Sequence, residues 1–214
     1  MRPTKIKTYL ALGDSMSIDA YTGVKGGGAV SQFYRRLCQR QNPDGTPPAW
    51  RLFDDSYDGC VMSGVPLTCR PGGVDLITVT IGGNDLLQNM HRGIDEYRPE
   101  FEAAYRRLMG RLQKLGRRRA ADGGPSDAVV IVGNIYRPTP GMLSDHLLSV
   151  LEGVNAFIGE QVRKYGHRLA DIAAAFQGNE ERFLVMGIEP NLAGATEIAR
   201  LFEQTAQDAG LFRA

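Results

Sequence analysis

Short apolar runs alternate with longer segments of helical periodicity along most of the chain. The runs of strand length lie at residues 6–12, 50–54, 75–81, 128–132 and 167–172. Between and after them, the spacing of apolar residues predicts helices over residues 30–40, 98–121, 143–165 and 190–202. Because parallel strands need crossover connections, this alternation predicts a parallel sheet with helices on both faces. No repeat or linker interrupts the pattern, so we expect residues 1–214 to form a single domain.

Two of the predicted strands end in polar turns that contain glycine. The first strand is followed by Gly-Asp-Ser at 13–15, and the third by Gly-Gly-Asn-Asp at 82–85. Taken alone, each is an ordinary turn that could also cap a helix. Because ligands bind at the carboxyl ends of strands in open parallel sheets, the pair is more informative. We expect Ser15 and Asn84 to lie at the same edge of one sheet.

Composition and charge are those of a globular protein and do not favour binding to nucleic acids or membranes. Of the 214 residues 43% are apolar and 23% are charged, as in ordinary globular proteins. The formal net charge of +1 creates no general attraction to nucleic acid or to anionic membranes. The odd count of three cysteines favours reduced thiols, and a Cys60–Cys69 disulfide would need an oxidising compartment. No leader precedes the first strand and no apolar run approaches ~20 residues, so we expect a cytoplasmic protein without membrane contact.

The two turns, with a third segment between them, resemble the sequence blocks of the SGNH hydrolases, also called the GDSL esterase and lipase superfamily. Residues 13–15 resemble the first block, with Met16 where leucine is usual, and residues 82–85 match the Gly-x-Asn-Asp block in full. Asp58-Gly59, after the second predicted strand, resembles the remaining upstream block. The resemblance implies a three-layer α/β/α sandwich of the flavodoxin-like type, with about five parallel strands.

The same resemblance implies ester hydrolysis by a serine nucleophile. Ser15 is the implied nucleophile, and its attack on an ester would form an acyl-enzyme. The implied oxyanion hole consists of the backbone amides of Ser15 and Gly59 and the side-chain amide of Asn84. Gly64, in the same glycine-rich loop as Gly59, is an alternative for that donor.

Three further residues are assigned supporting roles, namely Asp14, Gly82 and Asp85. We expect Asp14 to bond backbone amides across the turn and to fix the serine loop, not to act as the acid of a triad. No Cys/His pattern has the spacing of a metal site, and no phosphate or dinucleotide loop occurs. We therefore expect neither a metal nor a cofactor.

The general base is where the chain departs from the superfamily. The last block of the family is Asp-x-x-His, but residues 186–189 here read Met-Gly-Ile-Glu. Met186 thus occupies the position of the aspartate, and Glu189 occupies the position of the histidine. In the first interpretation Glu189 is itself the base, which requires a dry site that raises its pKa from roughly 4.3 toward neutrality.

Two other interpretations stay open. In the second, another histidine serves as the base: His91 and His146 follow strands on the carboxyl side of the sheet, whereas His167 is expected at the opposite edge. In the third, hydrolysis is lost and the pocket only binds a carbohydrate or acyl ligand. Glu189 would then cap the last helix or pair with a cation such as Arg137.

The leading hypothesis is a serine-dependent ester hydrolase of the esterase, lipase or acetylesterase type. The expected partner is a small-molecule ester or an acylated sugar, and the alternative is a catalytically silent SGNH-like binding domain. The rim of the site is predicted to come from loops at residues 19–29, 56–73 and 136–141, whose composition does not disclose the substrate.

Overall fold

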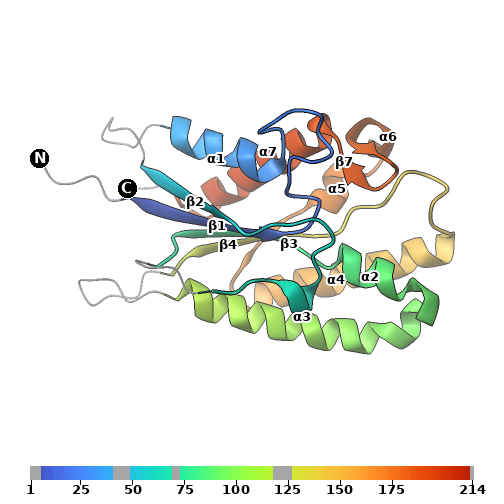
Figure 1. The fold of residues 1–214 in the computed structure, drawn as a ribbon. Coiled ribbons are helices and arrows are strands. Elements are labelled where there is room, and N and C mark those ends of the chain that lie inside the picture. The colour runs from blue at the N-terminus through green and yellow to red at the C-terminus, as the bar shows by residue number, and fades with distance from the viewer. Residues whose placement is uncertain (1–5, 41–48, 69–72, 118–126, 213–214) are drawn as a thin grey trace, which may run out of the picture.

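The computed structural model describes residues 6–40, 49–68, 73–117 and 127–212, and it shows a central sheet between two layers of helices (Figure 1). The sheet has five parallel strands in the order β2-β1-β3-β4-β5. The strands are β1 (Lys7–Gly13), β2 (Trp50–Asp54), β3 (Leu76–Thr80), β4 (Val129–Gly133) and β5 (Arg168–Ala170). The predicted three-layer α/β/α sandwich is therefore confirmed, and each predicted strand is present.

Burial of the strands follows their place in the sheet. Every residue of β3, the middle strand, is buried, and only the first residue of β1 and of β4 is partly exposed. Strands covered on both faces read as continuous apolar runs, and for this reason these three were readily predicted. The edge strands β2 and β5 retain exposed positions, and β5 is only three residues long.

One face of the sheet is covered by α1 (Ala29–Gln39) and α7 (Leu192–Asp208), with the short helices α5 (Ile172–Phe176) and α6 (Glu180–Phe183) beside them (Figure 1). Aromatic rings join this layer to the sheet: Phe33 of α1 packs edge-on against Tyr9 of β1 and lies 5.8 Å from the ring of Phe202 in α7. Burial of these rings contributes to the attraction between the layers, together with the aliphatic side chains around them.

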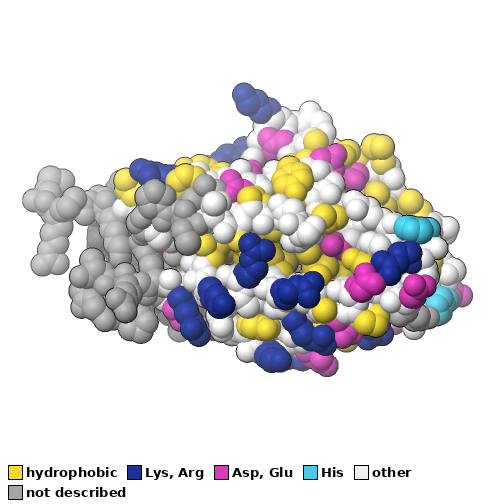
Figure 2. Space-filling model, turned by 60° about the horizontal axis from the view of Figure 1, so that its bottom comes forward, with side chains coloured by type: hydrophobic (Ala, Val, Ile, Leu, Met, Phe, Trp, Pro, Cys, Tyr) yellow, Lys and Arg dark blue, Asp and Glu magenta, His cyan; other side chains and the backbone are white. Residues whose placement is uncertain are grey.

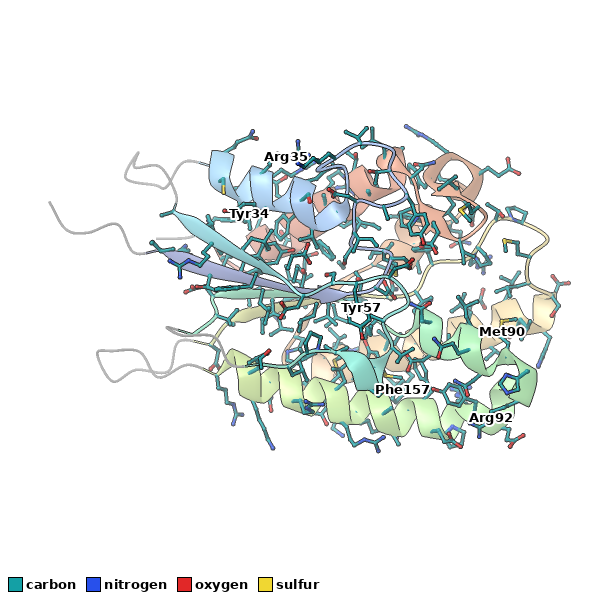
Figure 3. All side chains as sticks on the ribbon, in the orientation of Figure 1. Tyr34, Arg35, Tyr57, Met90, Arg92 and Phe157 are labelled. Carbon is teal, nitrogen blue, oxygen red and sulfur yellow. The ribbon has the colours of Figure 1, made fainter. Side chains whose placement is uncertain are left out.

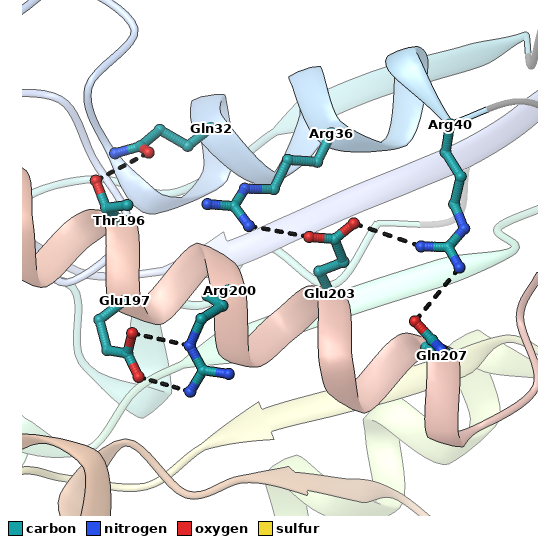
Figure 4. A network of polar contacts seen from close by, with 8 residues as sticks. All are labelled: Gln32, Arg36, Arg40, Thr196, Glu197, Arg200, Glu203 and Gln207. Carbon is teal, nitrogen blue, oxygen red and sulfur yellow. Dashed lines mark hydrogen bonds and ion pairs between the residues drawn. The ribbon is translucent and has the colours of Figure 1, made fainter.

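Polar contacts also connect α1 to α7 along their exposed sides (Figure 4). Glu203 of α7 accepts from Arg36 at 2.9 Å and from Arg40 at 3.4 Å. All three side chains keep roughly a third of their surface in solvent. Because exposed ion pairs contribute only about 0–1 kcal/mol each, they align the two helices more than they stabilise them.

The opposite face is covered by α3 (Ile94–Gly116) and α4 (Asp145–Lys164), with α2 (Gly83–Asn89) at one end (Figure 1). The rings of Phe101 and Tyr105 in α3 stack, and Phe157 of α4 packs edge-on against Tyr105. Toward solvent, this side of the molecule carries basic and acidic side chains interspersed with one another (Figure 2).

The predicted helix boundaries differ from the observed ones in particular places. The helix expected from residue 98 begins at Ile94 and contains Pro99, and its predicted end at residue 121 lies outside the described residues. The closing helix begins at Leu192, not at residue 190, because Asn191 is its N-cap. The Asn191 side chain accepts from the backbone N–H groups of Ala193 and Gly194.

Several short elements were not predicted. Beyond α2, α5 and α6, they are the 3₁₀ turns η1 (Met62–Gly64) and η2 (Met90–Arg92) and an antiparallel hairpin of β6 (Leu184–Val185) and β7 (Glu189–Pro190). The loop expected over residues 56–73 is otherwise irregular where it is described, and Cys69 lies outside the described residues. Of the helices in the described part of the chain, none has both the length and the apolar character needed to span a bilayer.

The junction of β3 and α2 depends on Gly82, whose φ of +116° is unfavourable for any other residue. A Cβ at this position would also lie 3.3 Å from the Phe101 ring. We expect Gly82→Ala to lower the free energy of unfolding by about 3 kcal/mol in urea titrations followed by circular dichroism. Gly23→Ala is the matched control, because Gly23 has a φ of +69° but no atom within 4 Å of its Cβ position.

For Gly23→Ala the expected loss is only the backbone term of about 1 kcal/mol. Equal losses in the two variants would contradict the role given to the contact between residue 82 and Phe101.

Candidate active site

The turn that carries Ser15 is attached to the end of β3. The Asp14 N–H donates to the carbonyl oxygen of Thr80 at 3.0 Å, and the hydroxyls of Ser17 and Thr80 are 2.7 Å apart. A Cβ on Gly13 would overlap both of these hydroxyls, so only glycine permits this approach. Ser15 is therefore held beside the carboxyl end of the neighbouring strand.

Asp14 lies beneath the serine and is almost completely buried, with 2% of its surface exposed. Its Oδ1 accepts from the Met16 N–H at 3.1 Å, which closes the turn around Ser15. Burial raises the pKa of Asp14 to about 7, and the nearby charge of Glu189 acts in the same direction. Asp14 thus carries a proton over much of the pH range in which ordinary aspartates are charged.

The turn that carries Asn84 is joined to the loop after β2. The Asn84 Nδ2 donates to the Cys60 carbonyl oxygen at 3.1 Å. The buried carboxylate of Asp85 accepts the Met62 N–H with both oxygens, at 3.1 and 3.2 Å. The bond to Cys60 fixes the orientation of the Asn84 side-chain amide and leaves its second Nδ2 hydrogen for another acceptor.

Gly59 precedes Cys60 in this loop, is exposed and has a φ of +72°. Within the described residues, the backbone N–H groups of Ser15 and Gly59 donate to no protein acceptor. The N–H of Gly64, by contrast, donates to the Val61 carbonyl oxygen at 2.9 Å. Of the two glycines considered as oxyanion donors, only Gly59 has a free N–H, although it does not line the cavity described below.

Glu189 stands on β7 and reaches the serine turn from the other side. The Ser15 hydroxyl interacts with its carboxylate and favours the charged form. The Glu189 Oε2 is buried and has no hydrogen-bond partner among the described residues. Burial nevertheless raises the pKa of Glu189, and the charge of Asp58 adds to this effect.

The hairpin that carries Glu189 is docked on the segment after β4. The Tyr136 hydroxyl donates to the Ile188 carbonyl oxygen at 2.6 Å, and the Thr139 N–H donates to that of Gly187 at 2.9 Å. Met186 lies at the hairpin tip with a φ of +54° and 75% of its surface exposed. The position of the family's aspartate therefore provides no acid partner for Glu189.

Two structural roles suggested for Glu189 are not observed. The guanidinium of Arg137 forms an ion pair with Glu152 of α4, not with Glu189. The cap of α7 is provided by Asn191. Both suggestions were wrong, because Glu152 pairs with Arg137 and Asn191 caps α7.

The described histidines lie away from the serine. His91 in η2 and His146 in α4 are exposed and do not line the cavity that contains Ser15, and histidine side chains are visible on the outer surface (Figure 2). His167 is buried before β5, where its Nε2 lies 3.3 Å from the Met109 carbonyl oxygen and burial lowers its pKa. None of the three lines the cavity that contains Ser15 in the described structure.

A cavity of about 250 Å³ brings the candidate residues together at the carboxyl ends of β1, β3 and β4. Ser15, Asn84, Asp14 and Glu189 form its polar end, and apolar side chains of α2, α4 and the segment 135–143 form its walls. Figure 3 shows Tyr57 and Met90 on this side, toward which the strands point. The described residues contain no cluster of three or more His, Cys, Asp or Glu side chains placed to hold a metal ion.

The raised pKa of Asp14 predicts a specific dependence of stability on pH. The folded state binds the Asp14 proton more tightly than the unfolded chain does, so protonated Asp14 stabilises the fold at low pH. This contribution is lost as the pH rises to about 7. Relative to wild type, Asp14→Asn should gain up to about 4 kcal/mol of unfolding free energy between about pH 4 and about pH 8.

Urea titrations at the two pH values measure this gain. Asp145→Asn, which removes an exposed aspartate from the first turn of α4, controls for the change of net charge. A pH-independent difference for Asp14→Asn would show that Asp14 has an ordinary pKa.

No model of a protein family and no curated protein sequence matches the chain. Solved structures do. A lipase from a goat rumen metagenome superposes with a TM-score of 0.70 at 18% identity, covering 97% of this chain and 99% of the lipase. A member of the lipolytic G-D-S-L family from Veillonella parvula has a TM-score of 0.67 at 15% identity, over 95% and 99% of the two chains.

An acetylxylan esterase from Geobacillus stearothermophilus has a TM-score of 0.67 at 17% identity, over 93% of each chain. A further structure of that esterase, with a TM-score of 0.66, is a catalytic mutant in which a histidine is replaced by alanine. Similarity of this kind extends over 93–97% of this chain. The chain therefore has the three-layer fold of the SGNH hydrolases.

Proposed function

We propose that the protein is an SGNH-type ester hydrolase in which Ser15 is the nucleophile and Glu189 is the general base. The observation that carries the proposal is a cavity that brings Ser15, Asn84 and Glu189 together, with the Glu189 carboxylate half-buried and its pKa raised by that burial. Nucleophilic catalysis by serine needs a base in contact with the hydroxyl and donors for the oxyanion. Both are available at this end of the cavity.

In the proposed reaction, the Glu189 carboxylate takes the proton of Ser15 while the Ser15 Oγ attacks the ester carbonyl. The N–H groups of Ser15 and Gly59 and the second Nδ2 hydrogen of Asn84 stabilise the oxyanion. Glu189 then passes the proton to the leaving alcohol, and the acyl-enzyme is hydrolysed by water with Glu189 again as base. Removal of one such oxyanion donor typically reduces the rate about 100- to 1000-fold.

A carboxylate can replace imidazole here because of where Glu189 lies. Its ordinary pKa would make it a weak base for a serine hydroxyl, but burial raises that pKa toward the range in which general bases are effective. Below about pH 7 Asp14 is protonated, so no second negative charge lies beside the Glu189 carboxylate. The Geobacillus esterase depends on a histidine, whereas the described histidines of this chain lie outside the cavity.

A catalytically silent binding domain is the second candidate, and one observation favours it. Met186 is an exposed hairpin residue, so Glu189 has no second carboxylate to orient it as the family's histidine has. Such a domain would bind the same esters in the cavity without turning them over.

Hydrolysis of aryl esters by wild type, Ser15→Ala and Glu189→Gln separates these candidates. We expect both variants to lose about 1000-fold or more in kcat/KM, since nucleophile and base act as a unit. His91→Gln and His146→Gln serve as controls and should retain wild-type turnover. No wild-type turnover above the Ser15→Ala background would contradict the hydrolase and favour the binding domain.

The pH profile identifies the base. Glu189 must be ionised to accept a proton, so kcat/KM should rise with pH through the pKa of Glu189, at a midpoint above the ordinary value of a glutamate. Glu189→Asp should keep an ascending limb at lower turnover. A limb that disappears in His91→Gln or His146→Gln, and not in Glu189→Gln, would assign the base to that histidine.

A further inference from the structure

The walls of the cavity are almost entirely apolar. Apart from the polar end at Ser15, the described side chains that line it are aliphatic or aromatic, with a single tyrosine whose hydroxyl already donates to Ile188. The carboxyl side chains in the lining are those of Asp14 and Glu189, and the lining contains no lysine, arginine or histidine. An anionic or strongly polar acyl group would find no cation and few free donors there.

Large apolar side chains continue from the walls to the mouth. Leu87, Met90 and Met142 line the cavity and are yet 45%, 38% and 51% exposed. Clustered exposure of this kind marks a surface for an apolar ligand, and methionine side chains adapt readily to the shape of one. The cavity therefore opens through an apolar rim.

The two sides of Ser15 differ in polarity. The cavity lies toward β3 and β4, between α2, α4 and the segment 135–143. On the β2 side of Ser15 lie the half-buried Tyr21 and the exposed Asp58, and the Tyr21 hydroxyl donates to the Asp58 carboxylate at 2.7 Å. The charge of Glu189 acts on the Tyr21 hydroxyl, and the charge of Asp58 acts on the Glu189 carboxyl, so both residues lie near Glu189. The β2 side is polar and open, and the β4 side is apolar and enclosed.

We propose that the cavity binds the unbranched apolar acyl chain of a neutral ester, with the alcohol leaving on the Tyr21 and Asp58 side. This inference rests on the proposed function and narrows it, because it excludes acetyl esters as the preferred substrates. The carbonyl carbon lies at Ser15, the acyl chain extends along the walls of α2 and α4, and the acidic polar end repels the fatty acid anion once it has formed.

The size of the cavity sets the chain length. A volume of 250 Å³ corresponds to about eight groups of the size of a water molecule, which is close to that of a methylene. The preferred chain is thus on the order of eight carbons. Each methylene that enters the cavity should raise kcat/KM about fourfold until the walls are filled.

The experiment compares ethyl esters of increasing acyl length with octyl acetate, using wild type and Ser15→Ala. We expect kcat/KM to rise at least about 100-fold from ethyl acetate to ethyl octanoate. The kcat/KM for octyl acetate should remain close to that for ethyl acetate. Turnover that depends on Ser15 but is highest for ethyl acetate would overturn the acyl-chain inference and leave the hydrolase intact. Octyl acetate as the best substrate would assign the cavity to the alcohol instead.

Leu147→Trp tests the location of the chain. Leu147 lies half-buried on the α4 wall of the cavity, and Leu148, next to it on the same helix, is half-buried outside the cavity. Leu147→Trp should shift the preference in kcat/KM to shorter acyl chains, whereas Leu148→Trp should keep the chain-length profile of wild type. An identical profile in both variants would contradict the inference.

Binding of octanamide and acetamide, measured by calorimetry, provides a readout that needs no turnover. Octanamide should bind wild type at least about 100-fold more tightly than acetamide, and Leu147→Trp should remove most of this difference. If no ester is hydrolysed but octanamide binds in this way, the proposed catalysis fails and the apolar chain site stands. Equal affinity for the two amides would overturn the chain site.

Discussion

The register of β1 against β3 is the constraint on which the candidate site depends. Gly13 pairs with Thr80 at the last step of this ladder, and the next residues on each strand form the two polar turns. Because side chains alternate between faces along a strand, a slip of one residue would move the two turns apart and direct the buried side chains of one strand into the opposite helix layer. The overlap that any Cβ on Gly13 would make with Thr80 shows how closely the two strand ends approach.

The site then uses two carboxyl groups in different surroundings. Asp14 is enclosed by the strand ends and bonded to the backbone, which suits a group that shapes the turn and stays neutral over much of the pH range. Glu189 is half-buried, approaches from a separate element and interacts with the serine hydroxyl. Environments that separate the pKa values of nearby acids are a usual means of giving them different roles.

Much of this arrangement could be read from the amino-acid sequence. The buried strands were predictable because covered parallel strands are continuous apolar runs, and the meeting of Ser15 with Asn84 followed from the topology of parallel sheets. Helix α2 was missed because Gly82 and Gly83 are poor helix formers at its start. The hairpin at 184–190 was missed because strands of two residues show no alternation.

The walls of the cavity could not be predicted for a different reason. They come from α2, from the segment 135–143 and from α4, which are distant in sequence and are brought together only by packing on β3 and β4. Similarly, the partner of Arg137 and the exposure of Met186 depend on how the β6–β7 hairpin packs against the rest of the fold. The spacing of apolar residues along the chain does not predict this packing.

The hairpin itself has a consequence for how activity and folding are related. The proposed nucleophile Ser15 and the proposed oxyanion donor Asn84 follow strands of the central sheet, whereas Glu189 belongs to a two-stranded element attached through the Tyr136 hydroxyl, the Thr139 amide and the Asn191 side chain. Regions held by few contacts open locally without global unfolding. We therefore expect heat or mild denaturant to detach Glu189 from Ser15 reversibly while the helices and the central sheet persist.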